Sequence, residues 1–248
     1  MPEVNTNIPF LSIIIPAYNE ERRLPTTLRA IDNYLKQQKY NYEIIVVNDG
    51  SKDKTEQVLS SLEPQISNLK IINNKINKGK GAVVKQGILA STGRYRLFTD
   101  ADNSTPIDQA EKILFWLEKG YDVVIGSRDV KGAVLNPPQP FLRRLSGRLF
   151  SLFRKIVLDL WEIRDTQCGF KGFSKRAAED IFSRLKTKGF LFDVEALLLA
   201  KKLGYRIKEV GIHWKNDLES KVTFGSAIEM GMGLFRLRKQ LSKGGVLL

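Results

Sequence analysis

Two aspartates directly after an apolar run are the side chains of this sequence best suited to chemistry. Asp100 and Asp102 are separated by one residue and follow the segment 95–99, whose aromatic and aliphatic residues are typical of a buried strand. Carboxylate oxygens at this spacing suit Mg²⁺ or Mn²⁺, and such an ion in turn suits a substrate that bears phosphates. The same residues could instead form a turn that caps a helix beginning near Pro106. The tripeptide alone therefore predicts either a divalent-metal site or a capping turn.

Three other polar loops follow three other apolar runs. They contain Pro16, Ala17, Tyr18 and Glu20 in the first, Asp49 in the second, and Lys78, Gly79, Lys80 and Gly81 in the third. Because parallel strands present their carboxyl ends at one edge of a sheet, we expect all four loops to meet there. A carboxylate can accept hydrogen bonds from a base N–H, glycine lets the backbone approach a ligand, and lysine offers charge to phosphate. Each loop alone has the composition of a turn, but together they predict a pocket for a nucleoside diphosphate and a metal.

Apolar runs and amphipathic segments alternate through the first half of the chain, and these elements must position the loops. The patterns predict strands at 11–16, 42–48, 69–72, 95–99 and 121–125, with helices at 21–36, 54–62, 79–90 and 107–119. This alternation is typical of βαβ units, so we predict an α/β fold with a mostly parallel sheet flanked by helices. A further strand is expected at 205–210, and the proline-rich segment 131–140 predicts a loop or hinge.

Composition narrows the possible functions. Because the sequence has a single cysteine, Cys168, an internal disulfide is excluded. We interpret Cys168 as a small packed residue. One histidine, His213, excludes a histidine-based metal site, and allows a Ser-His-Asp or Cys-His mechanism only if His213 is its base. The net charge of +13 and the pI near 9.7 indicate an anionic partner, whether nucleic acid, anionic lipid or a phosphorylated substrate. The sequence has no RRM or zinc-finger signature, and we expect no nucleic-acid partner.

Positive charge is concentrated in the second half of the chain. No acidic residue lies between Asp129 and Asp159, and the segment 141–161 has the periodicity of an amphipathic helix with a basic face and with Ile156 on its apolar face. Such a helix could pack on the core or lie on an anionic membrane surface. A shorter basic helix, 227–240, could dimerise, touch a membrane or pack on the core, so the oligomeric state stays open. Neither a signal peptide nor a membrane span is visible, and we expect a cytoplasmic protein that is peripheral on the cytosolic face of a membrane.

The second half also carries a series of short motifs. It reads Arg-Asp-Thr-Gln-Cys-Gly-Phe-Lys at 164–171 and Phe-Asp-Val-Glu at 192–195, followed by Trp214 and by Ser220 and Lys221. With these motifs and the four loops, the chain resembles the family 2 glycosyltransferases, which use the GT-A fold, over about residues 10–225. Within them it is similar to the polyprenyl-phosphate sugar synthases, first to the dolichyl-phosphate β-glucosyltransferase group and next to the dolichol-phosphate mannose synthases.

The resemblance implies an inverting, metal-dependent transfer of one hexose, with glucose favoured, from a nucleoside-diphosphate sugar to dolichyl or undecaprenyl phosphate. UDP-glucose is favoured as the donor on motif similarity. GDP-mannose is the alternative, weakened because Ser104 stands where mannose synthases often carry Gln. A non-lipid acceptor is the alternative to the polyprenyl phosphate. The Gln-x-x-Arg-Trp signature of processive synthases is absent, which implies transfer of a single sugar, and the loop 16–20 lacks the glycine-rich basic sequence usual in nucleotidyltransferases.

The resemblance also implies roles for particular residues. For the donor, Pro16, Ala17, Tyr18 and Glu20 would line the nucleoside, and Asp49 would read the base edge. Lys78 would approach the diphosphate, and Asp100 and Asp102 would hold Mg²⁺ or Mn²⁺ against it. Arg128 would reach a phosphate or the sugar, Asp165, Gln167 and Lys171 would line the transfer site, and Lys221 would lie near the acceptor phosphate. Residues 1–130 would form the nucleotide-sugar-binding half of one GT-A domain and 131–225 its acceptor-binding half. Residues 226–248 would form a basic C-terminal helix and tail.

Overall fold

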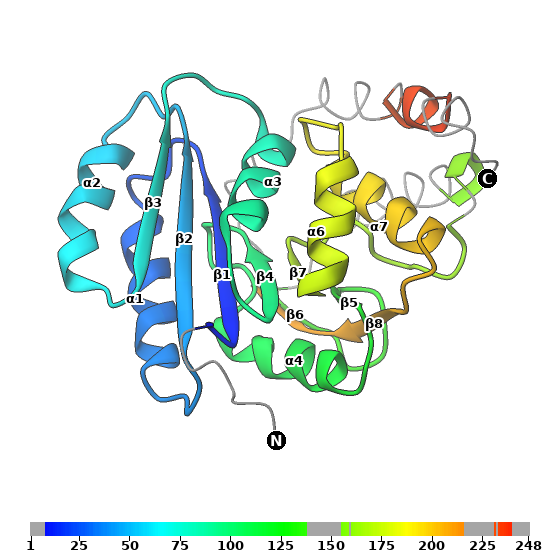
Figure 1. The fold of residues 1–248 in the computed structure, drawn as a ribbon, viewed down its shortest axis with the longest axis horizontal. Coiled ribbons are helices and arrows are strands. Elements are labelled where there is room, and N and C mark those ends of the chain that lie inside the picture. The colour runs from blue at the N-terminus through cyan, green and yellow to red at the C-terminus, as the bar shows by residue number, and fades with distance from the viewer. Residues whose placement is uncertain (1–7, 138–154, 159, 216–230, 232, 240–248) are drawn as a thin grey trace.

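The computed structural model describes residues 8–137, 155–158, 160–215, 231 and 233–239. Within this part of the chain, seven strands form one sheet in the order β3-β2-β1-β4-β7-β5-β8 (Figure 1). The strands are β1 (Leu11–Ala17), β2 (Tyr42–Asp49), β3 (Leu69–Asn74), β4 (Tyr95–Thr99), β5 (Val123–Ser127), β7 (Phe170–Ser174) and β8 (Ile207–Gly211). A separate two-stranded parallel sheet pairs β6 (Val134–Asn136) with β9 (His213–Lys215).

Helices cover both faces of the seven-stranded sheet (Figure 1). The helices are α1 (Leu24–Leu35), α2 (Thr55–Leu62) and α4 (Ala110–Glu118) on one face and α3 (Lys80–Ala90), α6 (Lys175–Arg184) and α7 (Phe192–Lys202) on the other, with the 3-10 turns η1 (Glu63–Gln65) and η2 (Ile107–Gln109). Successive side chains of a strand point to opposite faces. Ile13 and Ile15 accordingly pack with the first group of helices, and Ile14 packs with the second.

One strand runs against the others, and it matters for the site. β7 lies between β4 and β5 and is antiparallel to both, with Phe170 opposite Thr99 and Lys171 opposite Ile125. The segment 164–169, which leads into β7, therefore lies at the carboxyl ends of β4 and β5. This places the second-half motif at the same edge of the sheet as the polar loops of the first half.

The predicted α/β fold with a mostly parallel sheet is confirmed, and each predicted strand lies within two residues of its observed bounds. The patterns missed β7, α6 and α7. β7 has Lys171 and Gly172 between its aromatic residues, so it lacks the continuous apolar run of the other central strands. The loop predicted at 131–140 contains the short strand β6, which forms because β9 offers it a partner.

Only parts of the two basic segments are described. Residues 155–158 and 233–239 are helical. Val157 and Leu158 of the first segment, Leu160 shortly after it, and Leu234 and Leu237 of the second are buried in the same core cluster as the apolar side chains of α7. These parts therefore pack on the core. Ile156, predicted on the apolar face of the 141–161 helix, is 60% exposed, whereas its neighbours Val157 and Leu158 are buried. No helix in the described ranges is long and apolar enough to cross a membrane.

Candidate active site

The first and second polar loops are joined at the carboxyl edge of the sheet. The backbone N–H of Asn19 donates to Ser51 Oγ at 2.9 Å, and Asn19 Oδ1 accepts the N–H of Lys52 at 2.8 Å. Asn19 has a φ of 55°, in the left-handed region that asparagine tolerates better than most residues. The two loops therefore fix each other without help from a ligand.

The residues predicted to line the nucleoside lie where β1 ends. Pro16 and Ala17 are its last two residues, and Tyr18 follows as a half-buried side chain. The carboxylate of Glu20 accepts hydrogen bonds from Arg23 Nε and Nη2, both at 2.7 Å, and Glu20 is only 9% exposed. This pair fixes the passage from the loop into α1, and a direct contact of Glu20 with a nucleoside stays a prediction.

Asp49 joins the second loop to the third. It is buried, and its Oδ1 and Oδ2 accept the backbone N–H groups of Lys78 at 2.7 Å and Gly79 at 2.9 Å. Lys78 itself is exposed, and its Nζ donates to Asn74 Oδ1 at 2.6 Å. The carboxylate thus shapes the loop that begins α3, and its predicted contact with a base would use the lone pairs that remain.

Gly79 and Gly81, predicted to admit a ligand, lie against another loop of the protein. Gly81 N–H donates to the carbonyl oxygen of Lys188 at 2.7 Å, and a Cβ at Gly79 would lie 2.6 Å from the same oxygen. Gly79 also has a φ of 95°, which side-chain-bearing residues rarely adopt. The carbonyl of Lys188 therefore accepts N–H groups in the first turn of α3, and the predicted approach of a ligand to these two glycines stays a prediction.

Asp100 and Asp102 lie just beyond β4, as predicted. The carbonyl between them, of Ala101, accepts the hydroxyl of Thr27 from α1 at 2.7 Å. Asp102 Oδ1 accepts the N–H of Ser104 at 2.9 Å, which closes a local turn. No side chain caps the 3-10 turn η2, so the alternative of a cap for the helix near Pro106 is wrong.

The 164–169 segment packs directly against Asp100. A Cβ at Gly169 would overlap the carboxylate of Asp100, so this close approach requires glycine. At the start of α3, Lys80 Nζ lies 2.6 Å from Asp100 Oδ1, and both side chains are about a quarter exposed, at 24% and 23%. Asp100 is therefore held between the start of α3 and the segment before β7. Lys80 links the third loop to the fourth, so all four loops are connected at one edge, as predicted.

The residues present fit a divalent cation. Burial, and then the charge of Asp100, raise the pKa of Asp102, and a divalent cation would relieve this repulsion between the two carboxylates. Burial alone would lower the pKa of Lys80, but Asp100, Asp193 and Asp102 raise it, so a cation is stabilised there. Among the described residues no group of three or more His, Cys, Asp or Glu side chains could hold a metal, so further ligands would come from a diphosphate and water.

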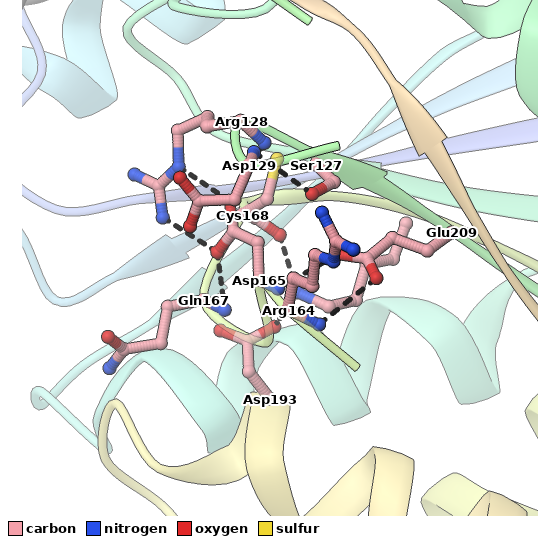
Figure 2. A network of polar contacts seen from close by, with 10 residues as sticks. Ser127, Arg128, Asp129, Arg164, Asp165, Gln167, Cys168, Asp193 and Glu209 are labelled. Carbon is pink, nitrogen blue, oxygen red and sulfur yellow. Dashed lines mark hydrogen bonds and ion pairs between the residues drawn. The ribbon is translucent and has the colours of Figure 1, made fainter. Parts of the chain in front are cut away.

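A second polar cluster lies at the end of β5 (Figure 2). Arg128 Nε and Nη2 donate to the two carboxylate oxygens of Asp165 at 2.7 and 2.8 Å, and the guanidinium lies over the Trp214 ring at 4.9 Å from its centroid. Asp165 Oδ1 also accepts the N–H of Gln167 at 3.2 Å. Glu209 Oε1 accepts the N–H of Asp165 at 2.8 Å, and this glutamate ties the segment to β8. Arg128, Asp165 and Gln167 are thus brought together as predicted.

The geometry decides what Asp165 can do. Burial would raise the pKa of this carboxyl, but Arg128 lowers it to about 2. Asp165 is 5% exposed, and both of its oxygens are bonded to Arg128. A carboxylate that is ionised far below neutral pH and already paired is a weak proton acceptor, so this arrangement favours positioning of Arg128 over base catalysis.

Lys171, predicted to line the transfer site, lies inside the protein. Its side chain is 0% exposed; Nζ donates to Asp193 Oδ1 at 2.6 Å and to the carbonyl of Cys168, and it lies 5.3 Å from the centroid of the Phe98 ring. Burial raises the pKa of Asp193 although Lys171 opposes the shift. The pair joins α7 to the segment before β7, so Lys171 stabilises the site from the interior of the protein.

Sequence reasoning assigned no individual role to four residues of this edge, namely Lys80, Asp193, Glu195 and Glu209. Glu195 is buried and accepts the N–H groups of Lys186 and Thr187, which holds the loop whose next carbonyl caps α3. The signal for Lys80 was present, because it stands between the two glycines of the third loop. Burial raises the pKa of Cys168 to about 12, which fits the packed role predicted for it. Lys221 lies outside the described residues.

Comparisons with known proteins agree with this architecture. The model of the family described as "Glycosyl transferase family 2" matches residues 12–182. Dolichyl-phosphate beta-glucosyltransferase of Dictyostelium discoideum is 40% identical over 242 residues, covering 92% of this chain and 74% of that protein. Dolichyl-phosphate beta-glucosyltransferase of Homo sapiens is 35% identical over 252 residues, covering 94% of this chain and 76% of that protein. A crystal structure of glucosyl-3-phosphoglycerate synthase from Mycobacterium tuberculosis with Mn²⁺, UDP and glucosyl-3-phosphoglycerate has a TM-score of 0.68 at 17% identity, covering 97% of this chain and 81% of that one.

The mostly parallel sheet, with a carboxylate pair at its carboxyl edge and one antiparallel strand behind it, defines a GT-A-like glycosyltransferase fold. The chain belongs to glycosyltransferase family 2. The predicted family, fold class and enzyme class are confirmed. The roles of single site residues and the division into donor and acceptor halves stay predictions.

Proposed function

We propose that this protein transfers one glucose residue from UDP-glucose to dolichyl phosphate. The observation that carries the proposal is the 40% identity, over 92% of the chain, to a protein named dolichyl-phosphate beta-glucosyltransferase. The similarity extends across both the carboxylate pair and the 164–171 motif. A fold neighbour, glucosyl-3-phosphoglycerate synthase, was crystallised with UDP-glucose and Mn²⁺, but at 17% identity this likeness is evidence for the fold alone.

The donor end of the reaction would use the carboxyl edge of β1, β2 and β4. Asp100 and Asp102 would hold Mg²⁺ or Mn²⁺, which when bound would supply Lewis-acid stabilisation of the departing diphosphate. Asp49 and Asn19 keep the surrounding loops in one arrangement, so a nucleotide would meet a largely preformed surface. Lys78 and Lys80 add positive charge beside the position of the diphosphate.

The acceptor end would use Arg128. Asp165 engages the Nε and Nη2 edge of its guanidinium, and the Nη1 edge would meet an anionic acceptor or the sugar. A phosphate acceptor is already anionic near neutral pH, so its oxygen needs no strong general base. Direct attack at the anomeric carbon would invert its configuration, and the rate would depend on how well Arg128 and the donor site align the two substrates.

The protein would bind its acceptor at a membrane surface. A polyprenyl phosphate carries its phosphate at the level of the lipid headgroups, and the net charge of +13 suits an anionic membrane surface on the cytosolic face. The segment 141–161 and Lys221 are the parts we propose for this contact. Co-sedimentation with vesicles containing anionic lipid at low salt tests it, with loss of binding at high salt as the expected behaviour; absence of binding at low salt would remove the membrane from the proposal.

The test of the function is a transfer assay. Purified protein is given labelled UDP-glucose or GDP-mannose, dolichyl phosphate, and Mg²⁺ or Mn²⁺, with phosphoglyceric acid as a water-soluble acceptor in a parallel reaction. We expect label from UDP-glucose in an acid-labile lipid. Label from GDP-mannose alone would replace glucose by mannose. Donor hydrolysis without lipid product, or transfer to phosphoglyceric acid, would keep the donor site and overturn the lipid acceptor.

A further inference from the structure

Lys80 is surrounded by acidic side chains at the donor edge. It is the first residue of α3, and its Nζ lies 2.6 Å from Asp100 Oδ1. Asp193 and Asp102 also act on it electrostatically. Asp193 has a partner of its own, since Lys171 Nζ lies 2.6 Å from its Oδ1. The carboxylate that depends on Lys80 for its neutralisation is therefore Asp100.

The position of this ammonium would conflict with a metal bound at Asp100. Asp100 is one of the two carboxylates proposed to hold the cation, and a divalent ion beside Asp100 would repel an ammonium bonded to the same carboxylate. The two cations therefore compete for Asp100. Since Asp102 Oδ1 already accepts the N–H of Ser104 at 2.9 Å, Asp102 has limited freedom to turn away and bind the metal alone.

The side chain of Lys80 has room to change its position, whereas the side chain of Lys171 does not. The Lys80 side chain is 24% exposed, at the edge of the sheet. Lys171 is 0% exposed and bonded to both Asp193 and the carbonyl of Cys168. The backbone around Lys80 is held independently, because Gly81 and Ala82 donate to the Lys188 carbonyl at 2.7 and 3.2 Å. Only the flexible side chain of Lys80 must shift.

We propose that Lys80 is an exchangeable counter-ion of the donor site: it neutralises Asp100 when the site is empty, leaves that carboxylate when the metal binds, and then pairs with the diphosphate. The inference rests on the metal-dependent donor site of the proposed function, and it does not depend on the acceptor. It makes metal and nucleotide bind cooperatively, because the nucleotide supplies the new partner that the displaced ammonium requires.

The exchange gives opposite effects on two affinities when the charge is removed. Lys80→Met keeps the length of the side chain but removes the competitor for Asp100, so Mn²⁺ should bind about tenfold more tightly in the absence of nucleotide. The same variant lacks the partner for the diphosphate, so UDP should bind about tenfold more weakly at saturating Mn²⁺. Lys80→Arg offers a two-pronged partner for Asp100, so Mn²⁺ alone should bind several-fold more weakly.

The measurement is a titration of the full chain with Mn²⁺, with free Mn²⁺ followed by electron paramagnetic resonance, in the absence and presence of UDP. Lys75→Met is the matched control, because Lys75 is an exposed lysine of the preceding loop and its removal changes the net charge equally. We expect its affinities to equal those of the wild type. Thermal unfolding without metal provides a second readout: Lys80→Met should unfold at a lower temperature, and saturating Mn²⁺ should restore most of the loss.

Other outcomes overturn the proposal. An Mn²⁺ affinity of Lys80→Met that equals or falls below the wild-type value would show that Lys80 does not compete with the metal. An unchanged UDP affinity would show that it does not reach the diphosphate. If Lys80→Met fails to fold, the weaker Mn²⁺ binding expected of Lys80→Arg still decides the matter. No polyprenyl phosphate enters these experiments, so the exchange could stand after a failed transfer assay, whereas a protein that binds no Mn²⁺ with or without UDP refutes it.

Discussion

Replacing Asp165 by asparagine separates a positioning role from a base-catalytic one. The side chain keeps its size but loses the charge that holds Arg128 through contacts of 2.7 and 2.8 Å. The pKa of Asp165 is lowered from the ordinary 3.8 to about 2, a difference that corresponds to about 2 kcal/mol of folding free energy at neutral pH. The substitution also leaves the Arg128 guanidinium, which is only 23% exposed, without its carboxylate partner. We therefore expect Asp165→Asn to lower the free energy of unfolding by about 3 kcal/mol in total.

The pH dependence has a definite sign. The unfolded chain binds the Asp165 proton at higher pH than the folded protein does, so the stabilisation is complete above the ordinary carboxyl pKa and is lost as the pH falls through the folded value. Urea unfolding of the wild type should therefore show this contribution disappearing between about pH 4 and pH 2, and Asp165→Asn should lack it. Asp122→Asn is the control, because the Asp122 carboxylate accepts one hydrogen bond, from the N–H of Arg206 at 3.0 Å, and forms no ion pair with any described residue.

Kinetics complete the test. If Asp165 positions Arg128, Asp165→Asn should lower kcat about a hundredfold through misalignment of the transfer site and leave the shape of the pH profile unchanged. An acid limb of the wild-type profile with a midpoint of about 5–7 that vanishes in the variant would identify Asp165 as a general base and refute this reasoning. Equal stability of the variant and the wild type at neutral pH would refute the electrostatic part.

Three further predictions concern other residues of the edge. Asp102→Asn should abolish transfer with Mg²⁺ or Mn²⁺ while circular dichroism and the melting temperature stay close to the wild type, because the side chain is a proposed ligand with one backbone contact; metal-supported turnover in this variant would contradict the assignment. Cys168 should not react with a thiol reagent at pH 8 until the protein is unfolded, since its thiol is buried and burial raises its pKa to about 12. Lys171→Met should destabilise the fold by about 3–5 kcal/mol in urea unfolding, because it leaves Asp193 buried without its cation; adding Asp193→Leu should recover part of the loss.

The sequence was sufficient for most of the fold and for the location of the site. Parallel central strands such as β1 and β2 are nearly continuous apolar runs, and their boundaries can be read directly. The convergence of the four loops follows from parallel topology alone. The Asn19 contacts and the Lys80–Asp100 pair, which link those loops, confirm it.

The remaining features depend on contacts between distant segments, which local patterns do not contain. Lys171 is charged, and a charged residue in a motif suggests a site; its burial is possible only because α7 brings Asp193 to it. Gly79 and Gly81 suggest a ligand-binding loop, but the carbonyls of Lys188 and Thr187, more than a hundred residues later, occupy the space that their side chains would need. Neither partner could be identified from the spacing of residues along the chain.

The antiparallel strand β7 explains why the donor and transfer sites are adjacent. Because it runs against β4 and β5, its entry segment reaches the edge where Asp100 lies, and Gly169 allows the segment to pack against that carboxylate. The same segment presents Asp165 to Arg128 at the end of β5. A short stretch of backbone thus contacts the proposed metal ligand on one side and the proposed anion-binding arginine on the other. Its position is held from below by the Lys171–Asp193 pair, so the distance between the donor and acceptor groups depends on a buried interaction that touches neither substrate.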